Sequence, residues 1–365
     1  MEKQRIESSG LITSYNCLDR TMTLLNSDKT LFRGNFNQTM LDYPTRVVLE
    51  IESYCSSGCK YCSEGEAVKC RNNISKNKLI SLIDEIEDMN IHEVTIRGGG
   101  EATEHPDFED IWEYASSKKS IASNILTNGM NLNLEKSKKF LKNKTSKLMI
   151  SLDGFKETNS QNRNSRQYGL VMSWLPNAIS EHPEQIGILS CLYRQNYNEI
   201  PSFAKFLAKM GLEHYHLPPL KRLGRSEIAD ENFVSLKETN KIQSDLDEIS
   251  KEFPRFKPVV SCVYLDKFKY NKNHGIPVPL FNEIHYGTGL KITPSGEVMV
   301  NRGIMFTERF KKGVTTEISL EPLGNIHEKS LREIWDKTKK IRIEQGKLAD
   351  KHYSYYLGWL KELEK

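Results

Sequence analysis

The chain has 365 residues, of which 38% are hydrophobic and 27% are charged, and its net charge is only +4. This composition is that of a soluble globular protein, and the length allows one large α/β domain of about 200 to 250 residues with a smaller module. The 52 Lys and Arg nearly balance the 48 Asp and Glu, so the charge indicates neither a nucleic-acid partner nor an anionic membrane. No early stretch resembles a signal peptide and no run of about 18 apolar residues occurs, so we expect a cytoplasmic protein.

Hydrophobic periodicity predicts alternating strands and helices over most of the chain. Residues 1–44 hold two short β-like stretches, around 11–15 and 21–25. Strands are then expected at 45–53, through Val94 and Ile96, and near 122–126, 147–152, 186–193 and 213–217. Amphipathic helices are expected at 75–89 and near 107–118, 133–142, 167–181, 198–210 and 231–252. Such alternation predicts a parallel sheet with helices outside, and sites on such sheets gather at the carboxyl ends of the strands.

The cysteines are distributed unevenly. Three of the seven, Cys55, Cys59 and Cys62, fall within eight residues directly after the first predicted strand. An odd number in a chain without a secretion signal argues against a disulfide framework. Three thiolates on one loop can bind one inorganic centre: a four-iron cluster would keep one iron without a protein ligand, whereas a structural zinc site would need a fourth ligand. A zinc knuckle or three buried thiols are the alternatives.

Small and polar residues follow the next strands. Gly98-Gly99-Gly100-Glu101 follows the second, Thr127-Asn128-Gly129 the third and Ser151-Leu152-Asp153-Gly154 the fourth. Consecutive glycines remove side chains where something approaches the backbone, and Glu101 offers an acceptor for a cation such as an ammonium.

Together these motifs resemble the radical S-adenosylmethionine (SAM) superfamily, over about residues 45–255. The resemblance implies an α/β fold with a partial (β/α)6 TIM-like barrel that holds a [4Fe–4S] cluster and SAM. In that family the reduced cluster cleaves SAM to methionine and a 5′-deoxyadenosyl radical, which abstracts hydrogen from the substrate.

The resemblance also assigns roles to individual residues. It implies that Cys55, Cys59 and Cys62 ligate iron. It implies that SAM is contacted by Tyr61 at the adenine, by Gly99, Gly100 and Glu101 at the amino group, by Asn128 through polar contacts, and by Ser151 and Arg163 at the ribose and carboxylate. Arg166 is an alternative to Arg163.

The chain beyond the barrel resembles the SPASM and twitch extensions of this family, which are small α+β modules. The similar segments are 217–225, 290–300 and 323–335, so we divide the chain into an N-terminal extension (1–44), a radical SAM core (45–255) and a degenerate extension (256–365). Cys262 is the only cysteine after Cys191, too few for an all-cysteine auxiliary cluster. Because such a cluster can accept an electron from a substrate radical, its absence favours a redox-neutral outcome, with Cys262 first and Cys191 second as candidate hydrogen donors.

The sequence thus favours a radical SAM enzyme acting on a peptide or a small polar molecule, for example by epimerisation. The alternatives are an enzyme modifying a sugar or aminocyclitol, and a non-catalytic iron–sulfur protein that binds SAM. The expected partners are the substrate and a reductant such as flavodoxin or ferredoxin, with no nucleic acid and no membrane.

Overall fold

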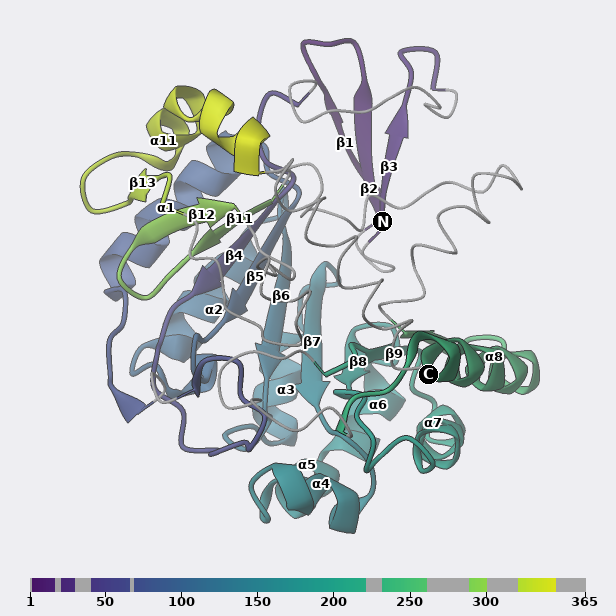
Figure 1. Cartoon of the computed structure of the whole chain (residues 1–365). Coiled ribbons are helices and arrows are strands. Elements are labelled where there is room, and N and C mark those ends of the chain that lie inside the picture. Colours follow the sequence, from purple (N-terminus) through teal and green to yellow (C-terminus); the bar gives the residue numbers. More distant parts are fainter. Residues whose placement is uncertain are drawn as a thin grey trace, which may run out of the picture.

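A ten-stranded sheet forms the centre of the molecule in the computed structural model, which describes residues 2–16, 21–29, 41–65, 69–220, 232–260, 289–300 and 321–345 (Figure 1). Its order is β10-β9-β8-β7-β6-β5-β4-β11-β12-β13, and the strands from β4 to β10 are parallel. These strands are β4 (Arg46–Glu50), β5 (Glu93–Arg97), β6 (Ala122–Thr127), β7 (Ser146–Ser151), β8 (Ile186–Leu189), β9 (His214–Leu217) and β10 (Lys257–Val260). The first six are the predicted barrel strands, and the fold class is confirmed. β10 was not predicted; it is a four-residue edge strand that contains Pro258.

Helices between the strands cover one face of the sheet. The predicted ones are present as α1 (Lys76–Asp88), α2 (Phe108–Ser117), α3 (Leu134–Phe140), α7 (Ile200–Lys209) and α8 (Leu236–Glu252). The single helix predicted at 167–181 is wrong: it is divided into α5 (Gln167–Met172) and α6 (Leu175–Glu181), because Pro176 lies in the first turn of α6 and cannot continue a preceding helix. A further helix, α4 (Lys156–Asn162), was not predicted, because its polar sequence has no apolar stripe.

The alternation of β4 shows how the sequence produces this packing. Val47, Leu49 and Ile51 are fully buried in the hydrophobic core, together with Leu82 and Ile86 of α1. Each such side chain contributes about 1.5 to 3 kcal/mol of burial free energy. On the other face, the alternate residues of β4 are free to carry the polar groups of the site described below.

A separate three-stranded antiparallel sheet precedes the core, with β1 (Glu2–Ile6), β2 (Ile12–Asn16) and β3 (Thr21–Leu25). The sequence indicated β2 and β3 and missed β1. Arg5 donates hydrogen bonds to the carbonyls of Tyr43 at 2.8 Å and Pro44 at 3.1 Å, and Thr13 Oγ1 lies 2.8 Å from His92 Nε2. These buried contacts attach the small sheet to the start of the core.

The C-terminal segment adds a hairpin to the central sheet. The segment 290–300 forms a hairpin of β11 (Gly289–Ile292) and β12 (Glu297–Val300), followed by β13 (Gly324–Asn325) and α11 (Leu331–Lys337). β11 pairs in parallel with β4, the strand that leads into the cysteine loop, and the N–H of Leu331 donates to Glu85 of α1 at 2.6 Å. The C-terminal segment is therefore joined directly to the start of the barrel.

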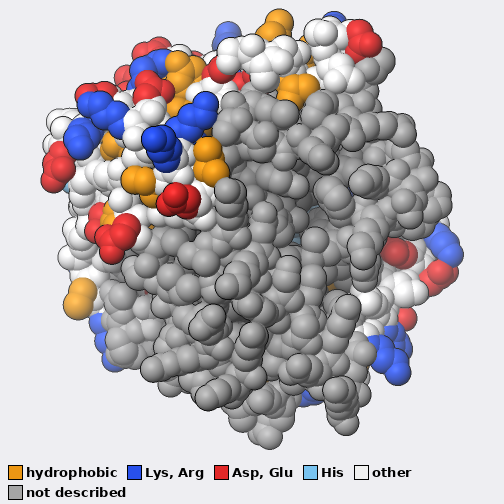
Figure 2. Space-filling model, turned by 45° about the horizontal axis from the view of Figure 1, so that its top comes forward, with side chains coloured by type: hydrophobic (Ala, Val, Ile, Leu, Met, Phe, Trp, Pro, Cys, Tyr) orange, Lys and Arg blue, Asp and Glu red, His pale blue; other side chains and the backbone are white. Residues whose placement is uncertain are grey.

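The surface agrees with the charge balance of the sequence. On the face shown in Figure 2, basic and acidic side chains are interspersed over the described residues. Within the described part of the chain, no helix has the length and apolar character needed to cross a membrane.

Candidate functional site

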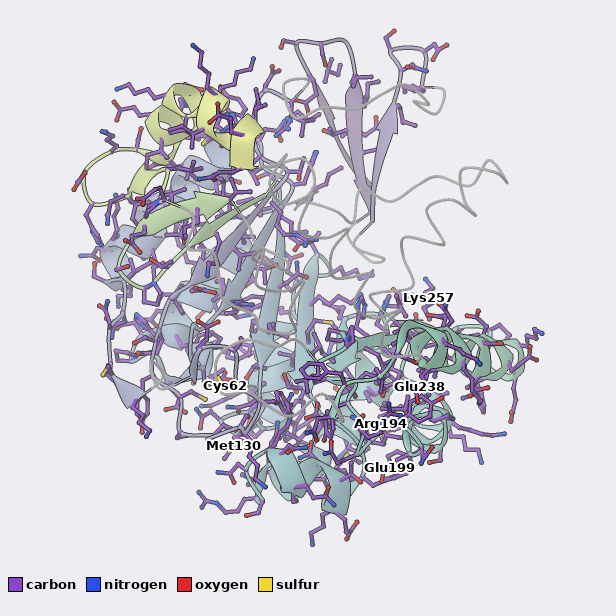
Figure 3. All side chains as sticks on the ribbon, viewed as in Figure 1. Cys62, Met130, Arg194, Glu199, Glu238 and Lys257 are labelled. Carbon is purple, nitrogen blue, oxygen red and sulfur yellow. The ribbon has the colours of Figure 1, made fainter. Side chains whose placement is uncertain are left out.

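The three clustered cysteines lie on the loop that follows β4. Cys55, Cys59 and Cys62 are half-exposed, and Gly58 between the first two has φ +66°, a left-handed conformation that glycine adopts without strain. In Figure 3, Cys62 and Met130 mark the loops after β4 and β6, at the carboxyl ends of these strands. The loop is thus where the parallel sheet predicts a site.

The sulfur atoms of Cys55 and Cys59 have polar neighbours. The N–H of Ser57 donates to Cys55 Sγ at 3.4 Å, and Ser57 Oγ lies 3.5 Å from Cys59 Sγ. Burial raises the pKa of the Cys55 thiol to about 12, and it raises the pKa of Cys62 as well. A bound cation is therefore needed to hold these groups as thiolates.

The ligand set fits a cluster with one open position. Among the described residues, no three His, Cys, Asp or Glu side chains meet closely enough to hold a single metal ion. A four-iron cluster instead places each cysteine on a different iron, and all three cysteines line one cavity of about 410 Å³. That volume is in the usual range for a small-molecule site, about 300 to 1,000 Å³. The residues present therefore fit a [4Fe–4S] cluster and an adjacent organic ligand.

The glycine run after β5 packs against the cysteine loop. A Cβ on Gly100 would lie 2.1 Å from the carbonyl oxygen of Tyr54, and the N–H of Glu101 donates to that same oxygen at 2.9 Å. A Cβ on Gly99 would have its nearest neighbour at 3.6 Å. The close approach expected from the sequence is thus made at Gly100 by the protein's own backbone, and only Gly99 has room beside it.

Glu101 joins the ends of two strands. Its carboxylate, only 4% exposed, accepts hydrogen bonds from Thr103 Oγ1 at 2.8 Å, Thr127 Oγ1 at 2.6 Å and the N–H of Asn128 at 2.7 Å. Burial raises the pKa of Glu101, against the effect of these donors. The carboxylate that the sequence offers to an ammonium also fixes the relative position of the loops after β5 and β6.

Arg163 is buried and pairs with Asp153. Its Nε lies 2.7 Å from Asp153 Oδ2 and its Nη2 lies 3.2 Å from Oδ1, while its side chain is 8% exposed. Arg163 is therefore a buried, paired group of the site and not a solvated loop charge. Arg166 is exposed and does not line the cavity.

A charged cluster that the sequence analysis missed borders the same cavity. Glu50, which is 2% exposed, accepts from Arg97 Nε at 3.1 Å and pairs with Lys291 of β11 at 3.1 Å. Arg97 also lies 3.8 Å from Glu64, which follows Cys62 in the loop. No motif marks these residues, because Lys291 and Glu50 meet only through the pairing of β11 with β4. Asp153 could have been identified from the sequence, because it lies within the Ser-Leu-Asp-Gly segment that follows the fourth predicted strand.

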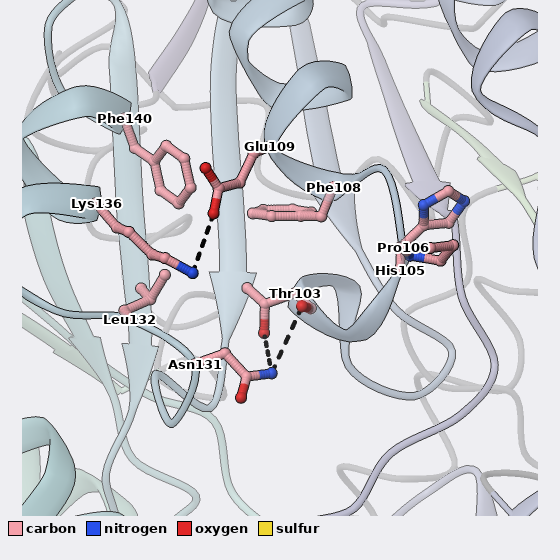
Figure 4. A pocket seen from close by; sticks show the side chains of 9 residues that line it. All are labelled: Thr103, His105, Pro106, Phe108, Glu109, Asn131, Leu132, Lys136 and Phe140. Carbon is pink, nitrogen blue, oxygen red and sulfur yellow. Dashed lines mark hydrogen bonds and ion pairs between the residues drawn. The ribbon is translucent and has the colours of Figure 1, made fainter.

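The cavity collects the predicted site residues. It is lined by Cys55, Cys59, Tyr61, Cys62, Gly99, Gly100, Glu101, Asn128, Ser151, Arg163 and Cys191. Cys262 lies outside the described residues. A smaller cavity of about 220 Å³ lies apart, between Thr103, Asn131 and the Lys136–Glu109 ion pair of 3.0 Å (Figure 4). It contains none of the predicted site residues, so the larger cavity is the candidate site.

Comparisons with known proteins give a matching family model and several similar proteins. The family model described as the Radical SAM superfamily matches residues 49–207. The mycofactocin maturase MftC of Mycobacterium ulcerans is 27% identical over 172 residues, which is 47% of this chain and 46% of MftC. A tungsten-containing aldehyde ferredoxin oxidoreductase cofactor-modifying protein of Pyrococcus furiosus is 22% identical over 300 residues, 79% of each chain. The match with MftC spans about half the length of that protein.

Solved structures with the same fold extend over more of the chain. SuiB of Streptococcus suis, in a crystal structure with S-adenosylmethionine, matches with a TM-score of 0.66 and 14% identity, over 92% of this chain and 86% of SuiB. anSMEcpe with bound AdoMet matches with a TM-score of 0.60 and 14% identity, over 88% of this chain and 99% of that chain. At these identities the likeness establishes the fold, a partial barrel with a C-terminal extension.

Proposed function

Because this chain carries a radical SAM domain, we propose that it is a radical SAM enzyme that takes a hydrogen atom from a peptide and returns one, without net oxidation. The observation that carries the proposal is the single cavity shared by Cys55, Cys59, Cys62 and Cys191. It brings a ligand set for a [4Fe–4S] cluster and a separate thiol to the same space. The division of the chain at residues 44 and 255 stays a prediction.

The side chains around the cavity suit SAM. When bound, the reduced cluster supplies the electron that cleaves SAM to methionine and a 5′-deoxyadenosyl radical. Glu101 offers a carboxylate to the amino group, and Gly99 leaves its backbone open beside it. Tyr61, Asn128, Ser151 and Arg163 supply further polar groups to the cavity wall. These SAM contacts are our assignments for this chain.

Cys191 supports the redox-neutral outcome. Its N–H donates to Asp153 Oδ1 at 2.9 Å, which fixes the backbone of a residue that lines the cavity. A thiol that gives a hydrogen atom to a substrate radical becomes a thiyl radical, and one electron and one proton must then restore it. The reductant that we propose for the cluster, a flavodoxin or ferredoxin, can supply that electron. Cys262, the first candidate of the sequence analysis, lies outside the described residues and stays an alternative donor.

The substrate class is proposed from the structural neighbours. One SuiB structure, which covers 92% of this chain, is described as bound to the precursor peptide SuiA. We therefore favour a peptide over a sugar or aminocyclitol. A cytoplasmic location and the absence of nucleic-acid and membrane partners stay predictions of the sequence.

Anaerobic turnover tests the proposal. Protein reconstituted with iron and sulfide is incubated with SAM and dithionite, and 5′-deoxyadenosine is measured by chromatography. We expect release by the wild-type protein and none by Cys55→Ala. A protein that binds iron and SAM without releasing 5′-deoxyadenosine is the non-catalytic alternative, and a colourless sample that contains zinc contradicts the proposal.

A second measurement tests the substrate. Candidate precursor peptides, with sugars as the comparison, are turned over in D2O and analysed by mass spectrometry. A gain of one mass unit in a peptide supports a hydrogen-returning peptide enzyme, whereas a loss of two hydrogens contradicts the redox-neutral outcome.

A further inference from the structure

Asp153 connects three parts of the site, although it has no contact with solvent. Its side chain is completely buried, and its two carboxylate oxygens receive four donors. The donors are the hydroxyl of Tyr61, Nε of Arg163 at 2.7 Å, Nη2 of Arg163 at 3.2 Å and the N–H of Cys191 at 2.9 Å. They come from the cysteine loop, the end of α4 and the segment after β8.

The backbone around Asp153 holds the carboxylate in place. The N–H of Asp153 donates to Asn159 Oδ1 at 2.9 Å, and its carbonyl accepts from Asn196 Nδ2 at 2.9 Å. The position of Asp153 is therefore set by neighbours on both sides of it, independently of Arg163. A fixed carboxylate with two oxygens is suited to orient a guanidinium, whose donors form a planar fork.

The orientation of Arg163 leaves one nitrogen directed at a cysteine. Nε and Nη2 are engaged by Asp153, and the remaining Nη1 lies 4.0 Å from Cys59 Sγ. The guanidinium carbon also lies 5.4 Å from the centre of the Tyr61 ring, which covers one side of the group. Arg163 therefore directs one donor at the sulfur of Cys59 while its other two donors pair with Asp153.

We propose that Asp153 is a positioning residue that holds the Arg163 guanidinium against Cys59 Sγ, and that this contact raises the reduction potential of the cluster that Cys59 ligates. The inference rests on the proposed function, because it requires a cluster on Cys59. Reduction adds one negative charge to the cluster and its thiolates. A guanidinium beside a thiolate, with little water between them, stabilises that charge, and hydrogen bonds and charges near the sulfurs are known to set cluster potentials.

This role differs from the contact with the SAM carboxylate that the sequence resemblance implies for Arg163. A contact with SAM alone affects SAM affinity and leaves the SAM-free cluster unchanged. A contact with Cys59 changes the cluster even without SAM. The two roles are therefore separated by measuring the reduction potential in the absence of SAM.

The test is an EPR-monitored redox titration of the reconstituted protein without SAM. For Arg163→Gln we expect the equilibrium constant for reduction to fall about tenfold, which is about 59 mV toward negative potential for one electron. The matched control is Arg166→Gln, the same substitution on an exposed arginine three residues away, which should keep the wild-type potential. A wild-type potential in Arg163→Gln overturns the proposal, even if its SAM affinity is reduced.

Asp153→Asn tests the positioning step. If Asp153 acts through Arg163, the potential falls as in Arg163→Gln, and the double variant falls no further. If Arg163 needs no anchor, loss of a buried negative charge raises the potential or leaves it unchanged, which overturns the positioning role. Should Asp153→Asn fail to fold, Arg163→Lys is the second variant: it keeps the charge and loses the fork, so a wild-type potential in it overturns positioning by Asp153.

The failure of this inference is distinguishable from the failure of the proposed function. Iron and sulfide analysis and 5′-deoxyadenosine release report on the cluster and on SAM cleavage in the same samples. Normal iron content and SAM cleavage with an unchanged potential in Arg163→Gln contradict only the inference.

Discussion

The ammonium of Lys291 lies 3.1 Å from the carboxylate of Glu50 and joins the C-terminal hairpin to the strand that leads into the cysteine loop. Glu50 is 2% exposed and also pairs with Arg97. Burial raises the pKa of Glu50, but the charges of Arg97 and Lys291 outweigh it and hold the pKa below its ordinary value. The buried carboxylate therefore depends on a residue from the C-terminal segment.

Lys291→Met should lower the free energy of unfolding by about 1 to 3 kcal/mol, because it leaves Glu50 buried with only one of its two cations. Urea denaturation at neutral pH measures the loss. The control is Lys337→Met, which removes an exposed pair with Glu333 at 3.4 Å and should change stability by less than about 0.5 kcal/mol. Equal losses of unfolding free energy in the two variants would contradict the prediction, because the buried pair with Glu50 would then stabilise the fold no more than an exposed pair.

His92 should make stability depend on pH. Burial first, and then the charges of Arg5 and Lys3, lower the pKa of His92 to about 3. The unfolded chain, with an ordinary histidine pKa of about 6.5, binds a proton that the folded protein does not bind. Stability is therefore fully present above about pH 6.5 and falls by about 1.4 kcal/mol per unit as the pH drops toward 3.

The measurement compares variants at pH 7 and pH 5. We expect the wild-type protein to lose about 2 kcal/mol more than His92→Gln over this interval. The control is His327→Gln, the same substitution at an exposed position. Parallel curves for the wild type and His92→Gln would contradict the prediction.

Gly99 and Gly100 should respond differently to alanine. Gly100→Ala places a Cβ 2.1 Å from the carbonyl oxygen of Tyr54. We therefore expect the free energy of unfolding to fall by about 3 kcal/mol or more, with a lower Tm. At Gly99 the nearest atom, Cγ of Pro294, is 3.6 Å from the new Cβ, so the fold should tolerate alanine. If SAM approaches this backbone, Gly99→Ala weakens SAM binding about tenfold or more, about 1.4 kcal/mol, at an unchanged Tm. Wild-type SAM affinity in Gly99→Ala would remove this residue from the SAM site.

The sequence predicts the β/α order because each barrel strand and most helices have a clear hydrophobic period. Two local features do not follow from this period. Pro176 divides one predicted helix, and α4 has no apolar stripe that would indicate a helix. At the site, the cysteine spacing and the residues after each strand could be read directly. The pairing of Lys291 with Glu50 could not, because it depends on β11 lying beside β4 across more than 200 residues of chain.

Cys191→Ala tests the source of the returned hydrogen. The wild-type enzyme in D2O should place one deuterium in the product, because the thiol proton exchanges with solvent. Without the thiol, product formation should fall at least about tenfold, a loss of about 1.4 kcal/mol of transition-state stabilisation, while 5′-deoxyadenosine is still released. This combination separates hydrogen return from hydrogen abstraction.

The matched control is Cys70→Ala. Cys70 is exposed and does not line the cavity, so its loss should change neither deuterium incorporation nor the rate. If Cys191→Ala keeps both the rate and the deuterium, the donor lies elsewhere, and Cys262→Ala becomes the decisive variant. If neither cysteine variant changes the product, the thiol mechanism is wrong and the hydrogen returned to the substrate comes from another source.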